Sequence, residues 1–244
     1  MQVTQYGLQE AFKRARQQIF IANLPEDAQV TGYMTCIGGA SQAQIQSASN
    51  AAQNAVLSQS YLRLIQQMTT NLNLFNFPVQ VDQPTVNPGE VRLQKQDALF
   101  ASSMAFYLAK GASATDVSYI PQTYPNKTTW PTGSGAGGLD TIYNGSLVLT
   151  INKSVILPNY SMRAFRQVPQ TQNGVGVTAQ TVFPIDQFDP SAVALWEPTI
   201  NLIGTKQNVW QLQLPANMTA TIEATTWGIF DIFGVLAQNV TLFT

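Results

Sequence analysis

Apolar and polar side chains alternate along much of residues 75–244, and this period of two predicts a chain built mainly from β-strands. We count about eight such segments, separated by loops rich in Pro and Gly, with no helical pattern between them. Strands that follow one another without a crossover helix pair antiparallel. We therefore expect an antiparallel jelly-roll β-sandwich, with a closed barrel as the competing arrangement.

The segments predict different degrees of burial. Phe75, Phe77, Val79 and Val81 alternate with polar residues, as in a strand with one buried face, whereas residues 99–109 are almost continuously apolar, as in a strand covered on both faces. We predict strands at residues 75–81, 99–109, 147–157, 162–168, 199–203 and 210–214, then around Ile222 and over residues 228–242, where one bent strand or two fit.

The first part of the chain has a helical period instead. One apolar stripe predicts a first helix that Pro25 ends, and its residues are Leu8, Phe12, Ala15 and Ile19. Ser41 is expected to cap a second, longer helix that runs to about Leu74, because no Pro or Gly interrupts it. The stripe of this second helix consists of Leu57, Tyr61, Leu64, Met68 and Leu72. The sequence thus divides into an N-terminal α-helical arm (residues 1–74) and a jelly-roll β domain (residues 75–244).

The remaining faces of the predicted second helix carry Gln, Ser, Asn and Thr, with Arg63 as the only charge. A helix face that meets water is normally charged. Two interpretations stay open: contact with another subunit, or packing against the chain's own β domain.

Few side chains can carry charge or exchange protons. The chain has no histidine and one cysteine, and its 12 basic and 13 acidic residues give a net charge of −1. Without imidazole the chain lacks the usual acid–base group near neutral pH, and Cys36 has no histidine to activate it. We expect no catalytic residue and no cofactor. A surface this poor in charge favours association, so we expect a homo-oligomer.

The candidate sites are few. Asp186, Asp189 and Glu197 are the nearest approach to an acidic cluster; oxygen ligands of this kind suit Ca²⁺, but we interpret them as charged loop residues and expect no metal site. The GSGAGG run at residues 133–138 lacks the lysine of a phosphate-binding loop. The long loops at residues 121–138 and 169–190 are the expected places for contacts with neighbours or a receptor.

Lys13, Arg14 and Arg16 form the only basic cluster. Three charges are too few to neutralise a packaged genome, so we expect no specific nucleic-acid recognition. They form either a solvated or interface face of a packed helix, or a contact with anionic lipid. No targeting segment or membrane span is expected, and the lone cysteine favours folding in a reducing compartment.

Several stretches together resemble a known type of protein. They are Glu90-Val91-Arg92-Leu93 leading into residues 97–107, then GSLVLTINKSVILP, FRQVPQTQ and the closing GIFDIFGVLAQNVTLF. With the amide-rich helices before them, they resemble a jelly-roll major capsid (coat) protein of a tailless icosahedral bacteriophage. The resemblance implies a closed icosahedral shell of many copies, grouped as trimers or other capsomers with other virion proteins, sometimes over an internal membrane that the N-terminal arm would meet.

In that family the subunit has one jelly roll or two. The strand count favours one, and a double jelly roll becomes the better interpretation if the first 74 residues prove to be strands. The expected function is that of a viral structural protein that self-assembles into a virion, in the host cytoplasm. The alternatives are a receptor-binding spike or fibre protein of the virion, and a β-sandwich carbohydrate-active enzyme with paired carboxylates.

Overall fold

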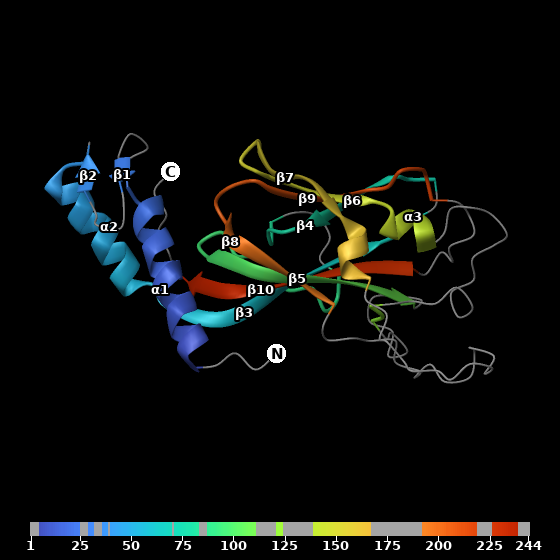
Figure 1. The fold of residues 1–244 in the computed structure, drawn as a ribbon, viewed down its shortest axis with the longest axis horizontal. Coiled ribbons are helices and arrows are strands. Elements are labelled where there is room, and N and C mark those ends of the chain that lie inside the picture. Colours follow the sequence, from blue (N-terminus) through green and yellow to red (C-terminus); the bar gives the residue numbers. More distant parts are fainter. Residues whose placement is uncertain are drawn as a thin grey trace.

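Two four-stranded antiparallel sheets, one above the other, form a β-sandwich (Figure 1). The computed structural model describes residues 5–24, 29–31, 36–38, 40–69, 71–82, 87–110, 121–123, 139–166, 192–218 and 226–238. The first sheet has the order β3 (Val56–Gln67), β10 (Thr226–Gln238), β5 (Ala98–Lys110), β8 (Val193–Ile203). The second has the order β4 (Leu74–Pro78), β9 (Asn208–Gln213), β6 (Ser146–Ile151), β7 (Ser154–Ser161). The prediction of a mainly β fold, built as an antiparallel sandwich, is therefore confirmed.

The main core lies between the two sheets. Its centre is a group of aromatic rings in which Phe230 of β10 contacts Phe77 at 4.8 Å and Phe106 at 4.7 Å between ring centroids. Both of these partners, like Phe230 itself, are completely or almost completely buried. Each large apolar side chain buried in this way contributes about 1.5–3 kcal/mol. The sandwich is therefore stabilised chiefly by the alternating inward-facing residues of its strands.

β5 is buried on both faces, as its continuous apolar run predicts. Within it the register shifts between Ala101 and Ser103, so Ser102 is an extra residue, a β-bulge. The bulge changes which residues face the core: Leu99 and Ala101 do so before it, Met104 and Phe106 after it. Gly234 of β10 lies opposite the bulge, and a Cβ added there would lie 2.1 Å from the carbonyl oxygen of Phe100.

We expect Gly234→Ala to destabilise the fold by about 1–3 kcal/mol, because the new methyl group can be accommodated only by moving the backbone of β5. Chemical denaturation, read as the change in free energy of unfolding, measures the effect. Ser102→Ala at the same bulge is the control and should be close to neutral, since its side chain is exposed. Equal stability of Gly234→Ala and the wild type would show that the bulge is not as tight as described.

Two helices cover one end of the outer face of the first sheet. α1 (Gln5–Ala22) buries Ala15 and Ile19, and α2 (Gln42–Asn54) buries Ala52, against a second apolar cluster that includes Phe100 and Val235. Gln18 of α1 also donates a hydrogen bond of 2.8 Å to Thr199 of β8. α1 thus packs against its own β-sandwich, and α2 packs chiefly against α1. The amide side chains of α2, such as Gln46 and Asn50, are exposed, so neither of the two interpretations left open above is decided for them. A short hairpin, β1 (Gln29–Thr31) with β2 (Cys36–Gly38), lies between them in sequence.

The predicted long helix to Leu74 is wrong. Ser41 does cap α2 with a capping box, but the helix ends at Asn54 and the chain continues as β3. β3 pairs with β10 over its whole length, from Val56 opposite Gln238 to Gln67 opposite Trp227. Leu62 and Leu64 face the core two residues apart, so strand pairing overrides a spacing that also fits a helix. The β part of the chain begins at Val56 and not at Phe75.

Two further predictions are corrected. Residues 147–157 form a hairpin of β6 and β7 and not one strand, because Asn152 and Lys153 both adopt positive φ (49° and 68°), as in a type I′ turn. Residues 162–165 form a 3₁₀ helix, η1 (Met162–Phe165), that buries its first and last side chains.

The remaining strand predictions hold apart from their ends: residues 75–78 lie in β4 and residues 99–109 in β5, whereas residues 79–81 and Leu214 lie just beyond a strand. Residues 199–203 lie in β8 and residues 210–213 in β9, while β10 is one strand with a register shift. Ile222 and residues 239–242 lie outside the described residues. A further short helix, α3 (Leu139–Tyr143), precedes β6 and buries Leu139 and Ile142 in the main core.

Candidate functional site

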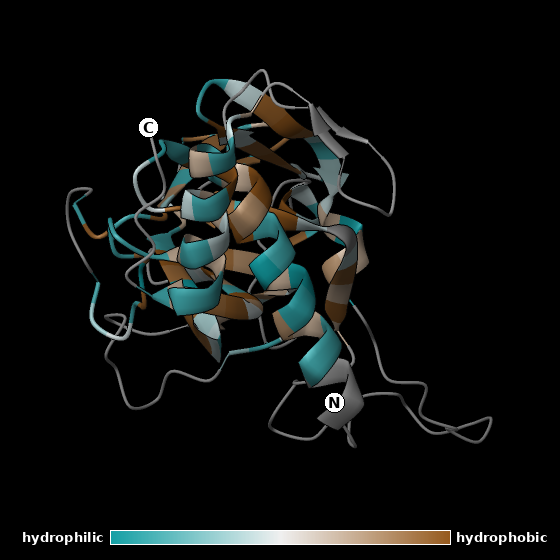
Figure 2. Cartoon of the chain, turned by 90° about the vertical axis from the view of Figure 1, so that its left-hand side faces the viewer, coloured by the Kyte–Doolittle hydropathy of each residue, from teal (hydrophilic) through white to brown (hydrophobic). Residues whose placement is uncertain are grey.

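The basic cluster lies on α1, on the outside of the helical layer. Figure 2 views the molecule from this end, where α1 and α2 lie side by side. Between them runs a shallow groove of about 500 Å³ whose lining residues are Gln9, Phe12, Lys13, Arg16, Gln17, Phe20, Ser49, Ala52 and Gln53. Lys13, Arg14 and Arg16 are exposed, and Arg16 donates a hydrogen bond of 3.2 Å to the carbonyl of Gln53. The helical layer therefore presents an apolar strip with positive charges at its rim.

The structure brings no acidic cluster together among the residues that it describes. Asp186 and Asp189 lie outside the described residues; Glu197 belongs to β8, but its side chain is not among those described. Within the described ranges, no group of three or more His, Cys, Asp or Glu side chains is placed to hold a metal ion. Residues 124–138, which include GSGAGG, and residues 169–190 also fall outside the description, as does the side chain of Cys36.

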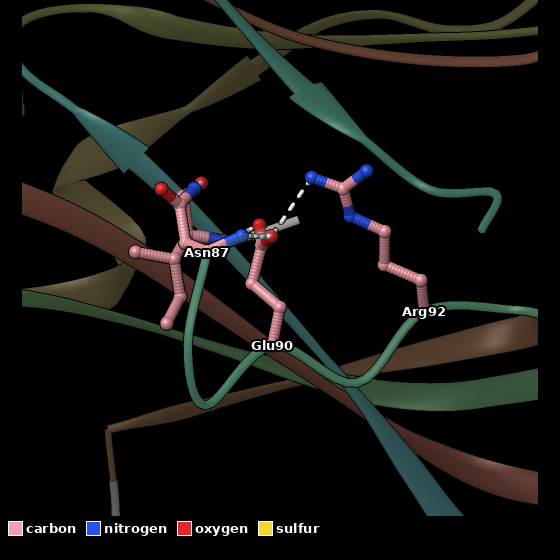
Figure 3. Close-up of polar contacts among 4 residues, drawn as sticks. Asn87, Glu90 and Arg92 are labelled. Carbon is pink, nitrogen blue, oxygen red and sulfur yellow. Dashed lines mark hydrogen bonds and ion pairs between the residues drawn. The ribbon is translucent and has the colours of Figure 1, made fainter. Parts of the chain in front are cut away.

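A buried polar cluster that the sequence did not reveal as a site lies on residues 87–93, hereafter the strap. Figure 3 shows its labelled residues, with the Glu90 carboxylate between Asn87 and Arg92. Glu90 and Arg92 form an ion pair, with 2.8 Å between Oε2 and Nη2, and their side chains are only 0% and 1% exposed. A charge buried to this degree is costly unless it is paired and fully hydrogen-bonded.

The carboxylate of Glu90 is satisfied by three donors. Besides Arg92, the backbone N–H of Asn87 donates to Oε2 at 2.5 Å, and the backbone N–H of Ile65 in β3 donates to Oε1 at 2.9 Å. The side-chain amide of Asn87 in turn donates to the carbonyl oxygen of Ile65 at 2.9 Å. This cluster attaches the strap to β3 near the C-terminal end of that strand.

Backbone hydrogen bonds complete the attachment of the strap to both sheets. Val91 and Arg63 of β3 exchange two bonds, at 2.9 and 3.0 Å. Leu93 donates to Val79 at 2.8 Å, just beyond β4, and accepts from Val81 at 3.1 Å. β3 and β4 are the edge strands on one side of the sandwich, and the strap pairs with β3 at Arg63 and with the chain just after β4. It therefore blocks part of the edge through which exposed strands would otherwise pair. Its charges serve the fold and are not available for chemistry.

A second ion pair lies on the outer face of the first sheet. Arg63 of β3 donates two hydrogen bonds, both 2.7 Å, to the carboxylate of Asp231 at the opposite position in β10. The Asp231 side chain is 5% exposed and that of Arg63 is 40% exposed. Burial, with a smaller contribution from the negative charge of Asp231, raises the pKa of the neighbouring Tyr107 hydroxyl, so this phenol stays neutral. The Arg63 guanidinium thus neutralises the negative charge of the buried Asp231 carboxylate within the first sheet.

The tryptophans serve the fold where they are described. Trp196 and Trp210 lie in the main core, 5.8 Å apart between ring centroids, and Trp227 is buried on the outer face of the first sheet.

No helix in the described part of the chain is long and apolar enough to cross a membrane. Comparisons with known proteins found no matching family model, no matching curated protein and no matching solved structure.

Proposed function

We propose that this chain is a virion structural protein, the major capsid subunit of an icosahedral shell, and that its fold is a single jelly roll. The order of the strands carries the proposal. Numbered from one to eight along the chain from β3 to β10, the strands run 1-8-3-6 in the first sheet and 2-7-4-5 in the second. This pattern fits two interleaved Greek keys, as in the eight-stranded jelly rolls that serve as capsid domains, lectins and cupins.

The number of strands supports one jelly roll and not two. A double jelly roll needs about sixteen strands. Of the first 74 residues, the structure describes as strands only the short hairpin, β3 and the first residue of β4, and β3 and β4 are needed to complete the eight.

Composition supports a coat protein over the other uses of this fold. A histidine-based metal site, the usual basis of metal-dependent chemistry, cannot be built from a chain that contains no histidine. A net charge of −1 and few charged residues suit a subunit whose surface is largely covered by neighbours. In such a shell the subunits form trimers or other capsomers with other virion proteins, after folding in the host cytoplasm. The exposed basic side of α1 is the part that would face an internal membrane.

Electron microscopy of the concentrated full-length protein tests the proposal. Closed shells or ordered sheets are expected, because many weak symmetric contacts add up in a lattice. Discrete trimers that never form a lattice would favour the receptor-binding spike instead. Particles no larger than a monomer at every concentration would contradict both.

A further inference from the structure

The outer face of the second sheet contains no charged side chain. None of the residues in β4, β9, β6 and β7 is Asp, Glu, Lys or Arg. The side chains on this surface, the uncharged face, are partly or fully exposed, and they include Leu74, Asn76, Ser146, Val148, Thr150, Val155, Val209, Gln211 and Gln213. Solvated faces of antiparallel sheets are normally polar, and exposed polar positions usually include charges. In the described part of the chain, the charged residues next to this sheet lie outside its strands, as Lys153 and Lys206 do in turns and Arg163 does in η1.

The outer face of the first sheet is different. Its end is covered by α1 and α2, and its middle carries the Arg63–Asp231 ion pair. The uncharged face has no such cover among the described residues, and its amides and hydroxyls are interspersed with exposed or half-buried apolar side chains such as Leu74 and Val155. Gln211 lies at its centre, opposite Asn76 on one side and Val148 on the other, and its amide donates to the Asn76 oxygen at 2.7 Å.

The chemistry of the uncharged face indicates which kind of partner it can bind. A charged partner, such as nucleic acid or lipid head groups, would lose hydration there without gaining a counter-charge. Amides and hydroxyls both donate and accept hydrogen bonds, so the face is complementary to a copy of itself. We propose that the uncharged face is a contact between two copies of this chain, related by a two-fold axis that passes close to Gln211. This inference rests on the proposed function and specifies which surface the subunits use.

The size of the face indicates how strong this contact is. The four strands lie about 4.8 Å apart and are on average about six residues long, so at 3.4 Å per residue the sheet spans roughly 19 by 20 Å. That is about 400 Å² of flat surface, well below the roughly 800 Å² that each partner buries in a standard stable interface. The contact is therefore weak between two isolated subunits and accumulates only when it is repeated in a lattice.

Opposite charges placed at Gln211 test the proposal. Gln211→Lys and Gln211→Glu are each expected to weaken self-association of the full-length protein at least about tenfold, because like charges then face one another across the axis. An equimolar mixture of the two variants should restore association, since lysine then faces glutamate. Sedimentation over a range of concentrations gives the association constants, and thermal unfolding checks that each variant is folded. Gln96→Lys, in an exposed turn, is the matched control and should associate like the wild type.

Each outcome supports or contradicts the inference. Loss of association in both single variants with recovery in the mixture supports a two-fold contact through this face. The inference is overturned if Gln211→Lys associates as strongly as the wild type, or if mixing the two variants does not restore the association that each has lost. Either result leaves the proposed coat function intact. A wild-type protein that never associates overturns both.

Discussion

Removal of residues 1–54 is expected to leave a folded protein, whereas removal of residues 1–74 is expected to abolish folding. The shorter deletion takes away α1 and α2 but keeps all eight strands of the two sheets. The longer deletion also removes β3, which pairs with β10 along its whole length. With β3 are lost its buried side chains Leu62, Leu64 and Ile65, and also the buried Met68 that directly follows the strand. At about 1.5–3 kcal/mol for each buried side chain, this loss is comparable to the roughly 5–15 kcal/mol that stabilises a typical domain.

Thermal unfolding followed by circular dichroism distinguishes the two deletions. The protein without residues 1–54 should unfold cooperatively at a lower temperature than the full chain, because Phe100 and Val235 lose their helical cover. The protein without residues 1–74 should show no cooperative transition. A cooperative transition in the longer deletion would mean that β3 is dispensable for folding.

Glu90→Ala is expected to cost about 3–5 kcal/mol of stability, the largest effect of any single substitution proposed for this chain. The substitution leaves the Arg92 guanidinium buried without the carboxylate that pairs with it, and it removes the acceptor for two backbone N–H groups. The strap should then detach from β3 and leave that part of the sandwich edge open. Amide hydrogen exchange of β3 should rise together with the loss of stability.

The exposed ion pair between Asp82 and Lys95 supplies a matched control for Glu90. Its 3.0 Å separation is similar, but its side chains are 50% and 69% exposed, so Asp82→Asn should leave the urea midpoint unchanged. A Glu90→Ala variant as stable as Asp82→Asn would show that the strap is not held by its buried charges.

Strands with a strict alternation or a long apolar run could be predicted from the sequence, because the polarity of consecutive residues indicates which side chains are buried. β5 and β9 are examples. β3 could not be, because Leu57, Tyr61 and Leu64 fit a helical spacing as well as a strand with two half-covered faces, and only the pairing with β10 decides between them. The turn between β6 and β7 was missed because Asn152 and Lys153 adopt positive φ without the glycine that usually signals it.

The candidate sites follow the same division. The basic side chains of α1 could be predicted because they depend on one helix, but the groove beside Lys13 and Arg16 needs α2 next to α1. Glu90 gave no signal because its acceptor role depends on the backbone of Ile65, 25 residues away in sequence. The uncharged face similarly appears only when β4, β9, β6 and β7 are placed in one sheet.

Sedimentation velocity of the full-length protein over a wide range of concentration shows whether this chain works as one of many identical subunits. We expect the sedimentation coefficient to rise with concentration, through small oligomers to large assemblies, because each contact is weak and their number grows in a lattice. A single species with the mass of one chain at every concentration would contradict it.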